Sequence, residues 1–261
     1  MLRLIAVIQT DEELCFVPKI KEVKTVHTKP CSLSAARNIG IKEIPEGEEG
    51  VIAFPDDDCW YNDTVLSAAL KNLERYDFVS SGCYDPIKKK GLGRNRTLGE
   101  ICAIDETNII LKPISVSIFY NFSSKDEIPR FDEKFGVGTE WGSGEESDFL
   151  LQLLFCGKRG LYDSTDVVFH EAEREKDLDP AVTYKYSVGF AAMIVKSLVL
   201  RGQKKIYSEF KKIMTRSRLA VIYYLFRPEK RAVYIARLKG FKRGLKEGRA
   251  FYGKLPDKEN R

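Results

Sequence analysis

The chain has 261 residues, of which 43% are hydrophobic and 31% charged, and these values exclude a disordered chain, a collagen-like repeat and a small disulfide scaffold. The length suits one large domain, or one domain with a helical extension. The net charge of +5 is unevenly distributed: residues 196–261 hold 20 Lys and Arg against 5 Asp and Glu, whereas residues 1–195 hold 23 against 33.

The first third of the sequence predicts strands that alternate with helices. The run Gly50–Pro55 is expected to be a buried central strand, because it is apolar and a proline ends it. The alternation predicts an α/β fold with a largely parallel sheet. The expected elements are strands at Leu2–Gln9 and Val23–His27, a helix from Ser32 to about Lys42, the strand ending at Pro55, a helix from Asn62 or Asp63 to about Arg75, and a strand at Phe78–Ser81.

The pattern is weaker from residue 85 to 130. Ile109–Leu111 is a candidate edge strand, and Ser115–Tyr120 is either a strand or the start of a helix. A helix is predicted from Ser143 or Gly144 to Cys156, followed by a strand at Val167–Phe169. Three basic amphipathic helices are expected after Pro180, at about 183–200, 203–225 and 228–247. We therefore predict a body at 1–177, a basic helical region at 178–251 and a flexible tail at 252–261.

Several kinds of protein are not indicated. No apolar run approaches the roughly 18 residues that a membrane-spanning helix needs, and the N-terminus lacks the pattern of an export signal. The six Cys show no C-x-x-C spacing and there are only two His, so a structural zinc site is not expected. These features predict a cytoplasmic protein with reduced thiols.

Three consecutive carboxylates, Asp56-Asp57-Asp58, directly follow the predicted strand at Gly50–Pro55. Ligands bind at the carboxyl ends of parallel strands, and clustered carboxylates repel one another unless they are solvated or bind a cation. Hard oxygen ligands suit Mg²⁺ or Mn²⁺, and such an ion can bridge phosphates. The alternative is an ordinary acidic turn before a helix.

Three further segments carry candidate chemistry. Arg37 beside Asn38 could donate hydrogen bonds to a phosphate, although a lone Arg on a helix is usually only exposed. Glu145 and Glu146 open a helix after a glycine-rich stretch; the helix dipole alone would explain them, and the alternative is a general base. His170 follows a strand and is a candidate ligand, or simply a hydrogen-bonded surface or core histidine.

These segments, in this order, resemble the family 2 glycosyltransferases with the GT-A fold. Ser34–Gly40 is similar to the family's S-x-A-R-N-x-G helix, and Phe54–Asp58 to its strand ending in the D-x-D metal motif. Phe131–Asp148 is similar to its acceptor loop with the E-D catalytic motif. The match covers about residues 2–175. The F-P-D-D-D-C-x-Y form resembles bacterial transferases that build surface polysaccharides.

The resemblance implies a Rossmann-like mixed sheet and roles for the matching residues. Donor binding would fall to Arg37, Asn38, Asp56, Asp57 and Asp58. Asp56, Asp58 and His170 would hold Mn²⁺ or Mg²⁺. Glu146 would be the general base, with Glu145 as the second choice because the family usually has Glu-Asp here. Acceptor-side residues would be Trp141, Gly144 and Asp148.

The implied reaction is the inverting transfer of a sugar from a nucleotide diphosphate sugar to a hydroxyl of a glycan or a lipid-linked acceptor. Against the family pattern, the strand at Leu4–Gln9 matches the second strand, so the first strand–helix unit is expected to be missing. That shortfall leaves a second interpretation open, a non-catalytic glycosyltransferase-like scaffold or partner protein.

The basic C-terminal region predicts attraction to an anionic membrane surface at the inner face of the cell membrane, unless it is only a solvated face. The aromatic residues expected to accompany the charges there are Tyr184, Tyr186, Phe190, Tyr223, Tyr224 and Phe226. Nucleic acid is not expected as a partner, because only the positive charge would support such binding and the sequence contains no recognised nucleic-acid-binding motif.

Overall fold

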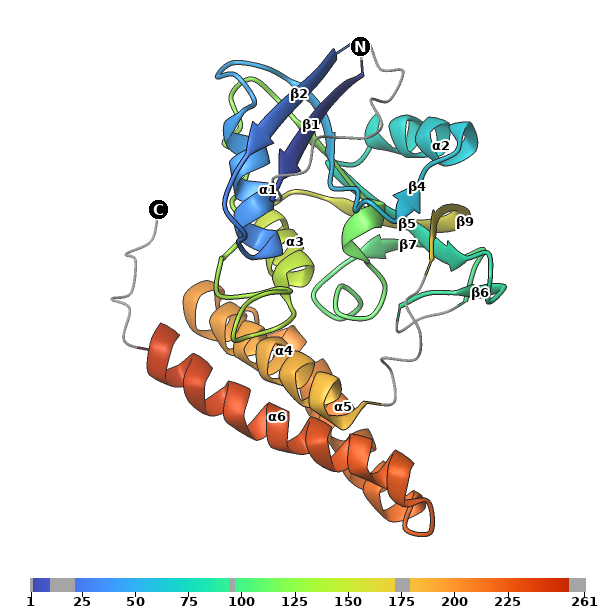
Figure 1. Cartoon of the computed structure of the whole chain (residues 1–261), viewed down its shortest axis with the longest axis vertical. Coiled ribbons are helices and arrows are strands. Elements are labelled where there is room, and N and C mark those ends of the chain that lie inside the picture. The colour runs from blue at the N-terminus through green and yellow to red at the C-terminus, as the bar shows by residue number, and fades with distance from the viewer. Residues whose placement is uncertain (1, 10–21, 94–96, 172–178, 254–261) are drawn as a thin grey trace.

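The computed structural model describes residues 2–9, 22–93, 97–171 and 179–253. Figure 1 shows an α/β body above the long helices of the C-terminal region. A mixed α/β fold with a C-terminal helical region is thus confirmed. The elements are β1 Arg3–Ile8, β2 Glu22–His27, α1 Leu33–Lys42, β3 Gly50–Ala53, β4 Cys59–Trp60, α2 Asp63–Leu73, β5 Phe78–Asp85, β6 Lys90–Gly91, β7 Ile101–Ile104, the 3₁₀ helix η1 Ser115–Ser117, β8 Ile118–Phe122, α3 Glu145–Phe155, β9 Gly160–His170, α4 Pro180–Arg201, α5 Lys204–Tyr223 and α6 Pro228–Tyr252.

The first two strands form a small parallel sheet of their own, in which Arg3 aligns with Glu22 and Ile8 with His27. α1 follows them and begins as predicted, because the Ser32 side chain accepts a hydrogen bond from the backbone N–H of Ala35. This pair of strands is separate from the main sheet in the described part of the chain.

The main sheet has seven strands in the order β3-β8-β5-β9-β4, with β6 beside β5 and β7 beside β9. Among the described strands of this sheet, only β5 and β9 pair in parallel, and the other pairings are antiparallel. The prediction of a largely parallel sheet is therefore wrong, while the mixed sheet is confirmed. The strand predicted to be central is also misplaced: β3 pairs only with β8 among the described strands, and Val51 is 40% exposed.

The weak middle segment holds further differences. Ile109–Leu111 is not an edge strand but part of a run of turns, with Ile109 buried. The segment at 115–120 contains both alternatives, since η1 leads directly into β8. β9 extends well beyond the predicted Val167–Phe169, and its register against β5 shifts after Ser81. A side chain at Gly82 would collide with Ser164 at this shift, so glycine is required there.

The two faces of the sheet bury different side chains. Phe78, Tyr120 and Tyr162 belong to one hydrophobic cluster, which includes Phe149 of α3. Their chain neighbours, including Val79, pack with α2 in a second cluster. This alternation is the period-two pattern of strands covered on both faces.

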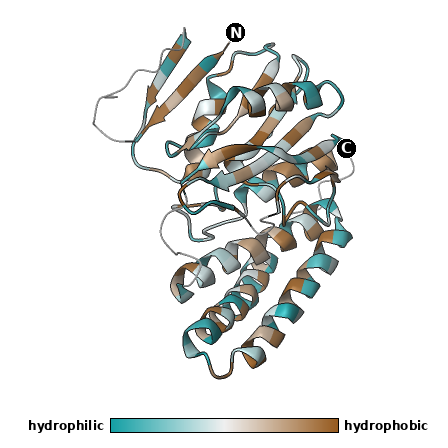
Figure 2. Cartoon of the chain, turned by 90° about the vertical axis from the view of Figure 1, so that its right-hand side faces the viewer, coloured by the Kyte–Doolittle hydropathy of each residue, from teal (hydrophilic) through white to brown (hydrophobic). Residues whose placement is uncertain are grey.

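The C-terminal helices pack onto the α3 side of the body. α4 is buried from Ser187 to Ser197, so the amphipathic pattern predicted for this helix is wrong. α6 lies closely along α4, since the glycines at Gly240, Gly244 and Gly248 leave room for it. A side chain at any of these three positions would collide with α4. In Figure 2 the lower helices show both hydrophilic and hydrophobic segments. Among the described residues, no helix has the length and hydropathy needed to cross a membrane.

Candidate active site

The turn after β3 brings three potential metal ligands together. Asp56–Asp58 lead from β3 into β4, which pairs antiparallel with the end of β9 so that Cys59 lies opposite His170. Asp58 Oδ1 therefore lies 3.2 Å from His170 Nε2. One donor atom each from Asp56, Asp58 and His170 lies within 4.8 Å of the other two, and we call these residues the donor group.

The donor group has the composition of a divalent-cation site. Two carboxylates and one imidazole suit Mn²⁺ better than Mg²⁺, which prefers oxygen ligands. Ligand atoms about 2.1 Å from one octahedral ion lie about 3.0 Å apart when adjacent and about 4.2 Å apart when opposite. The donor atoms lie within 4.8 Å of one another, a limit somewhat wider than the larger of these two spacings. Asp57 is exposed, as Asp58 is, but lies outside the donor group.

Arg37 connects the donor group to the rest of the site. Its Nη2 donates to Asp56 Oδ1 at 3.0 Å, and its guanidinium carbon lies 5.4 Å from the centre of the Phe131 ring. The Nη1 atom is buried and has no hydrogen-bond partner among the described residues. Because an unpartnered buried donor is costly, this nitrogen is suited to an incoming anionic oxygen.

Asn38 fixes a loop. Its Nδ2 donates to the carbonyl of Phe131 at 2.9 Å and to Glu133 Oε1 at 3.0 Å, and its Oδ1 accepts from the backbone N–H of Phe131 at 2.8 Å. Both amide hydrogens are thus used inside the protein. This leaves none for the phosphate contact expected from the sequence, and the structure gives Asn38 a positioning role.

Two glutamates open α3. Gly144 precedes them with a φ of 102°, a left-handed conformation that glycine favours. Glu145 is 7% exposed, whereas Glu146 is only partly buried. Burial, followed by the charge of Glu146, raises the pKa of Glu145 to about 8, although Arg37 acts in the opposite direction. Glu146 is therefore the more accessible carboxyl group of the pair.

Glu145→Gln is expected to stabilise the protein at alkaline pH. The pKa of Glu145 is about 8 in the folded chain against an ordinary 4.5, so the folded state binds more protons between these values and its stability falls as the pH rises through this range. Glutamine cannot ionise. At the acidic end of this range the variant and the parent should have similar free energies of unfolding. Above the pKa of the folded state the variant should be more stable by up to about 5 kcal/mol, at about 1.4 kcal/mol per pKa unit. Urea unfolding across this range measures the difference.

Glu140→Gln is the control for that measurement, because Glu140 is an exposed residue on the loop that precedes α3. Its effect on the free energy of unfolding should be small at every pH. A Glu145→Gln effect of equal size at acidic and alkaline pH would contradict the raised pKa.

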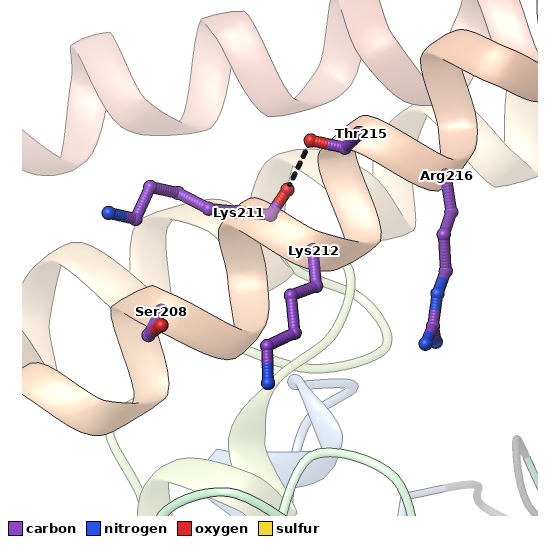
Figure 3. A pocket seen from close by; sticks show the side chains of 5 residues that line it. All are labelled: Ser208, Lys211, Lys212, Thr215 and Arg216. Carbon is purple, nitrogen blue, oxygen red and sulfur yellow. Dashed lines mark hydrogen bonds between the residues drawn. The ribbon is translucent and has the colours of Figure 1, made fainter.

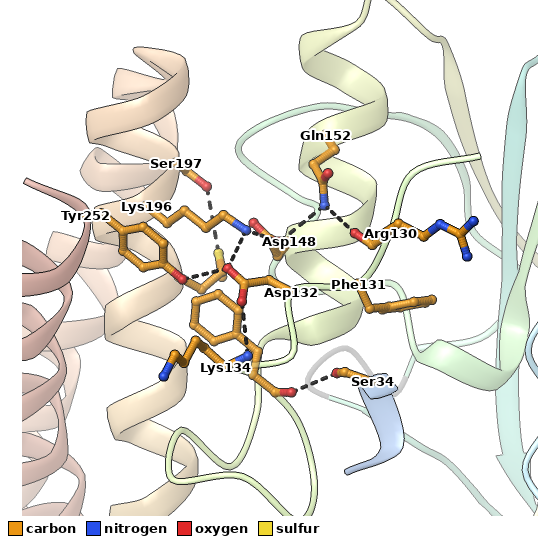
Figure 4. Close-up of polar contacts among 12 residues, drawn as sticks. Ser34, Arg130, Phe131, Asp132, Lys134, Asp148, Gln152, Lys196, Ser197 and Tyr252 are labelled. Atoms are coloured by element: carbon orange, nitrogen blue, oxygen red, sulfur yellow. Dashed lines mark hydrogen bonds and ion pairs between the residues drawn. The ribbon is translucent and has the colours of Figure 1, made fainter. Parts of the chain in front are cut away.

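A buried ion network joins this site to the C-terminal helices (Figure 4). Lys196 of α4 donates to Asp132 Oδ2 at 2.8 Å and to Asp148 Oδ2 at 2.7 Å. Arg201 donates to Asp148 Oδ1 at 2.9 Å, and the Tyr252 hydroxyl donates to Asp132 Oδ2 at 2.7 Å. The network therefore connects the loop before α3, α3 itself, α4 and the end of α6.

The three residues expected on the acceptor side lie in this contact region. Asp148 is fully buried, and Trp141 is 6% exposed and donates from Nε1 to Glu247 Oε2 at 3.0 Å. Gly144 is buried against Met193 of α4. None of the three presents an exposed side chain to an acceptor, so their acceptor-side role gains no support from the structure.

Sequence reasoning did not identify the partners that complete this region. Lys196 and Glu247 were predicted only as parts of basic helices, and Arg201 was placed between two of them. Tyr252 was predicted to begin a flexible tail; this is wrong, because Tyr252 ends α6, is 2% exposed and bonds to Asp132. One signal was present, since Lys196 interrupts the apolar run Val188–Leu200. A lysine at the centre of such a run is rarely buried without a charged partner.

Comparisons with known proteins do not assign a family to the chain. No family model matches its sequence, and no curated protein matches it significantly.

Proposed function

We propose that this chain is an inverting glycosyltransferase with a GT-A fold of the family 2 type. The observation that carries the proposal is the connection of a cation-suited donor group, through Arg37, to a pair of glutamates. Arg37 pairs with Asp56 on one side, and its charge acts on Glu145 on the other. The motif resemblance described above supports the same interpretation.

The donor would be a nucleotide diphosphate sugar. Asp56, Asp58 and His170 would hold Mn²⁺ or Mg²⁺, which when bound offsets the negative charge of a diphosphate leaving group. The Nη1 atom of Arg37 would donate to a phosphate oxygen. Of these two ions, the donor set favours Mn²⁺, because it includes an imidazole and Mg²⁺ prefers oxygen ligands.

The acceptor would be a hydroxyl of a glycan or of a lipid-linked sugar, as in bacterial surface polysaccharide synthesis. Its oxygen forms a bond to the anomeric carbon while the bond from that carbon to the diphosphate oxygen breaks, and the nucleoside diphosphate leaves with the electron pair. Glu146 takes the hydroxyl proton. Attack from the side opposite the leaving group inverts the anomeric configuration.

Asp58→Asn is expected to weaken Mn²⁺ binding by roughly 10- to 100-fold or more. The reason is that one charged ligand of three becomes a neutral amide. Loss of a residue that only hydrogen-bonds to a metal ligand already has an effect of that size. Isothermal titration with MnCl₂ measures metal binding, and a thermal-shift panel of nucleotide diphosphate sugars with and without Mn²⁺ identifies the donor. Release of the nucleoside diphosphate then measures turnover.

The matched control is Asp57→Asn, because Asp57 is the next carboxylate along the chain, is exposed like Asp58, and lies outside the donor group. Metal binding by this variant should equal that of the parent. Equal losses in the two variants would mean that the acidic turn attracts cations only diffusely. Full metal-dependent turnover by Asp58→Asn would contradict the proposed role of Asp58.

A second candidate is a non-catalytic glycosyltransferase-like partner protein. The burial of Trp141, Gly144 and Asp148 favours it, since the acceptor-side residues of an active enzyme should be accessible. Binding of a nucleotide sugar without turnover, in the presence of Mn²⁺ and a range of acceptors, would identify this function instead.

A further inference from the structure

The C-terminal end of α5 and the turn that leads to α6 expose a cluster of large apolar side chains. The two most exposed are Phe226 at 91% and Tyr223 at 80%. We call the following five residues the apolar tip: Leu219, Ile222, Tyr223, Leu225 and Phe226. Figure 1 shows this turn at the lower end of the molecule, away from the sheets. Several large apolar residues exposed on one turn indicate an interaction site, whereas single ones are ordinary.

Basic residues surround the apolar tip. The flanking cations are Arg216, Arg218, Arg227, Lys230 and Arg231, and Glu229 is the single acidic residue between positions 216 and 231. Arg216, Arg218, Arg227 and Lys230 are exposed. Apolar side chains bordered by Lys and Arg are the pattern by which interfacial helices bind anionic bilayers.

The positive charge continues along both helices. Residues 204–252 contain 15 Lys and Arg against three Glu. A groove of about 650 Å³ between α5 and α6 has an apolar floor that includes Met214, and its charged lining consists of Arg218, Lys242, Lys246 and Arg249. Arg218 thus belongs both to the groove and to the cations beside the tip.

A second hollow, of about 370 Å³, lies on α5 (Figure 3). Its charged side chains are Lys211, Lys212 and Arg216, and the figure shows Lys212 and Arg216 extending from the helix toward the same side. This hollow adds cations to the α5 segment that leads to the tip. The cations in this hollow and in the groove between α5 and α6 therefore attract anions to more than one side of α5.

We propose that the apolar tip inserts into the surface of an anionic lipid bilayer, with the flanking cations on the lipid headgroups. A polyanion such as nucleic acid would be attracted by the cations but would gain little from five exposed apolar side chains in water. Phe190, which was predicted from the sequence to lie on the membrane-facing surface, is excluded from it, because Phe190 is 4% exposed and lies in the core. The proposal is independent of the glycosyltransferase activity.

The test is flotation of the full chain with vesicles of phosphatidylcholine alone or mixed with phosphatidylglycerol. The parent should bind the anionic vesicles, and binding should fall with added salt. Ile222→Ser/Phe226→Ser should lower the partition coefficient by at least about tenfold. Arg216→Gln/Arg218→Gln should lower it about fivefold for each charge, on anionic vesicles only.

Ile87→Ser is the matched control, because Ile87 is 69% exposed, close to the 71% of Ile222, but lies after β5 in the body. It should leave vesicle binding unchanged. A second readout is Phe226→Trp, whose indole emission should shift to the blue with anionic vesicles.

Three outcomes would overturn the proposal. The first is no binding of the parent to anionic vesicles. The second is binding that neither pair of substitutions alters. The third is self-association, measured by light scattering, that Ile222→Ser/Phe226→Ser abolishes while vesicle binding persists, which would assign the tip to a second copy of the chain.

Discussion

Replacing Asp148 with asparagine is expected to lower the free energy of unfolding by about 3–5 kcal/mol. Asp148 has no exposed surface, and its two oxygens accept from Lys196 and Arg201, whose side chains are 9% and 7% exposed. Asparagine keeps the shape but removes the negative charge. Lys196 retains Asp132, whereas no other ion pair is recorded for Arg201 among the described residues.

Urea unfolding of the purified chain measures this loss. Glu209→Gln is the control, because it removes the acidic partner of Lys212 in an exposed pair on α5. That substitution should cost about 1 kcal/mol or less. If Asp148→Asn cost no more than the control, the buried network would not hold the helices to the body in the way that the contacts indicate.

Glu146→Gln is expected to lower turnover by about 10²- to 10⁴-fold with little change in donor affinity. The side chain keeps its size but can no longer take the acceptor proton. Because Glu146 is partly exposed and Glu145 is buried with a raised pKa, the loss should be larger at position 146 than at position 145. Product formation at saturating donor, together with donor affinity from titration, separates the two effects.

Glu140→Gln serves as the control for this measurement too, because Glu140 is exposed and pairs with Arg243 outside the proposed site. Its turnover should equal that of the parent. A large loss in Glu145→Gln with full turnover in Glu146→Gln would move the base to Glu145, and full turnover in both variants would remove the pair from the proposed mechanism.

Local features of the fold were predictable because their causes are local. Ser32 identifies the start of α1, and Gly144 marks the start of α3, since capping depends on a few neighbouring residues. The position of β3 was not predictable. Periodicity shows that a segment is a strand, but it does not show that β8 will lie between β3 and β5 in the opposite direction.

The candidate site was predicted in part. The motif resemblance indicated Asp56, Asp58 and His170, and the pairing of β4 with β9 brings them together. The buried contacts of Asn38 and Asp148 could not be predicted from the sequence, because residue type does not show which polar side chains the fold will bury. Lys196, inside an apolar run, carried a signal that could have indicated a buried charged partner, but no partner was predicted from it.

α6 has a geometric consequence for any bound surface. It runs from Pro228, beside the apolar tip, to Tyr252, whose hydroxyl contacts Asp132. These 25 helical residues form a spacer of about 36 Å at about 1.5 Å per residue. At Gly240, Gly244 and Gly248 this spacer lies directly against α4. If α6 stood upright on a bilayer, the site would lie far from the headgroups, and if α6 lay flat, the site would lie near them. The tilt of α6 would therefore determine how long an acceptor must be to reach Glu146.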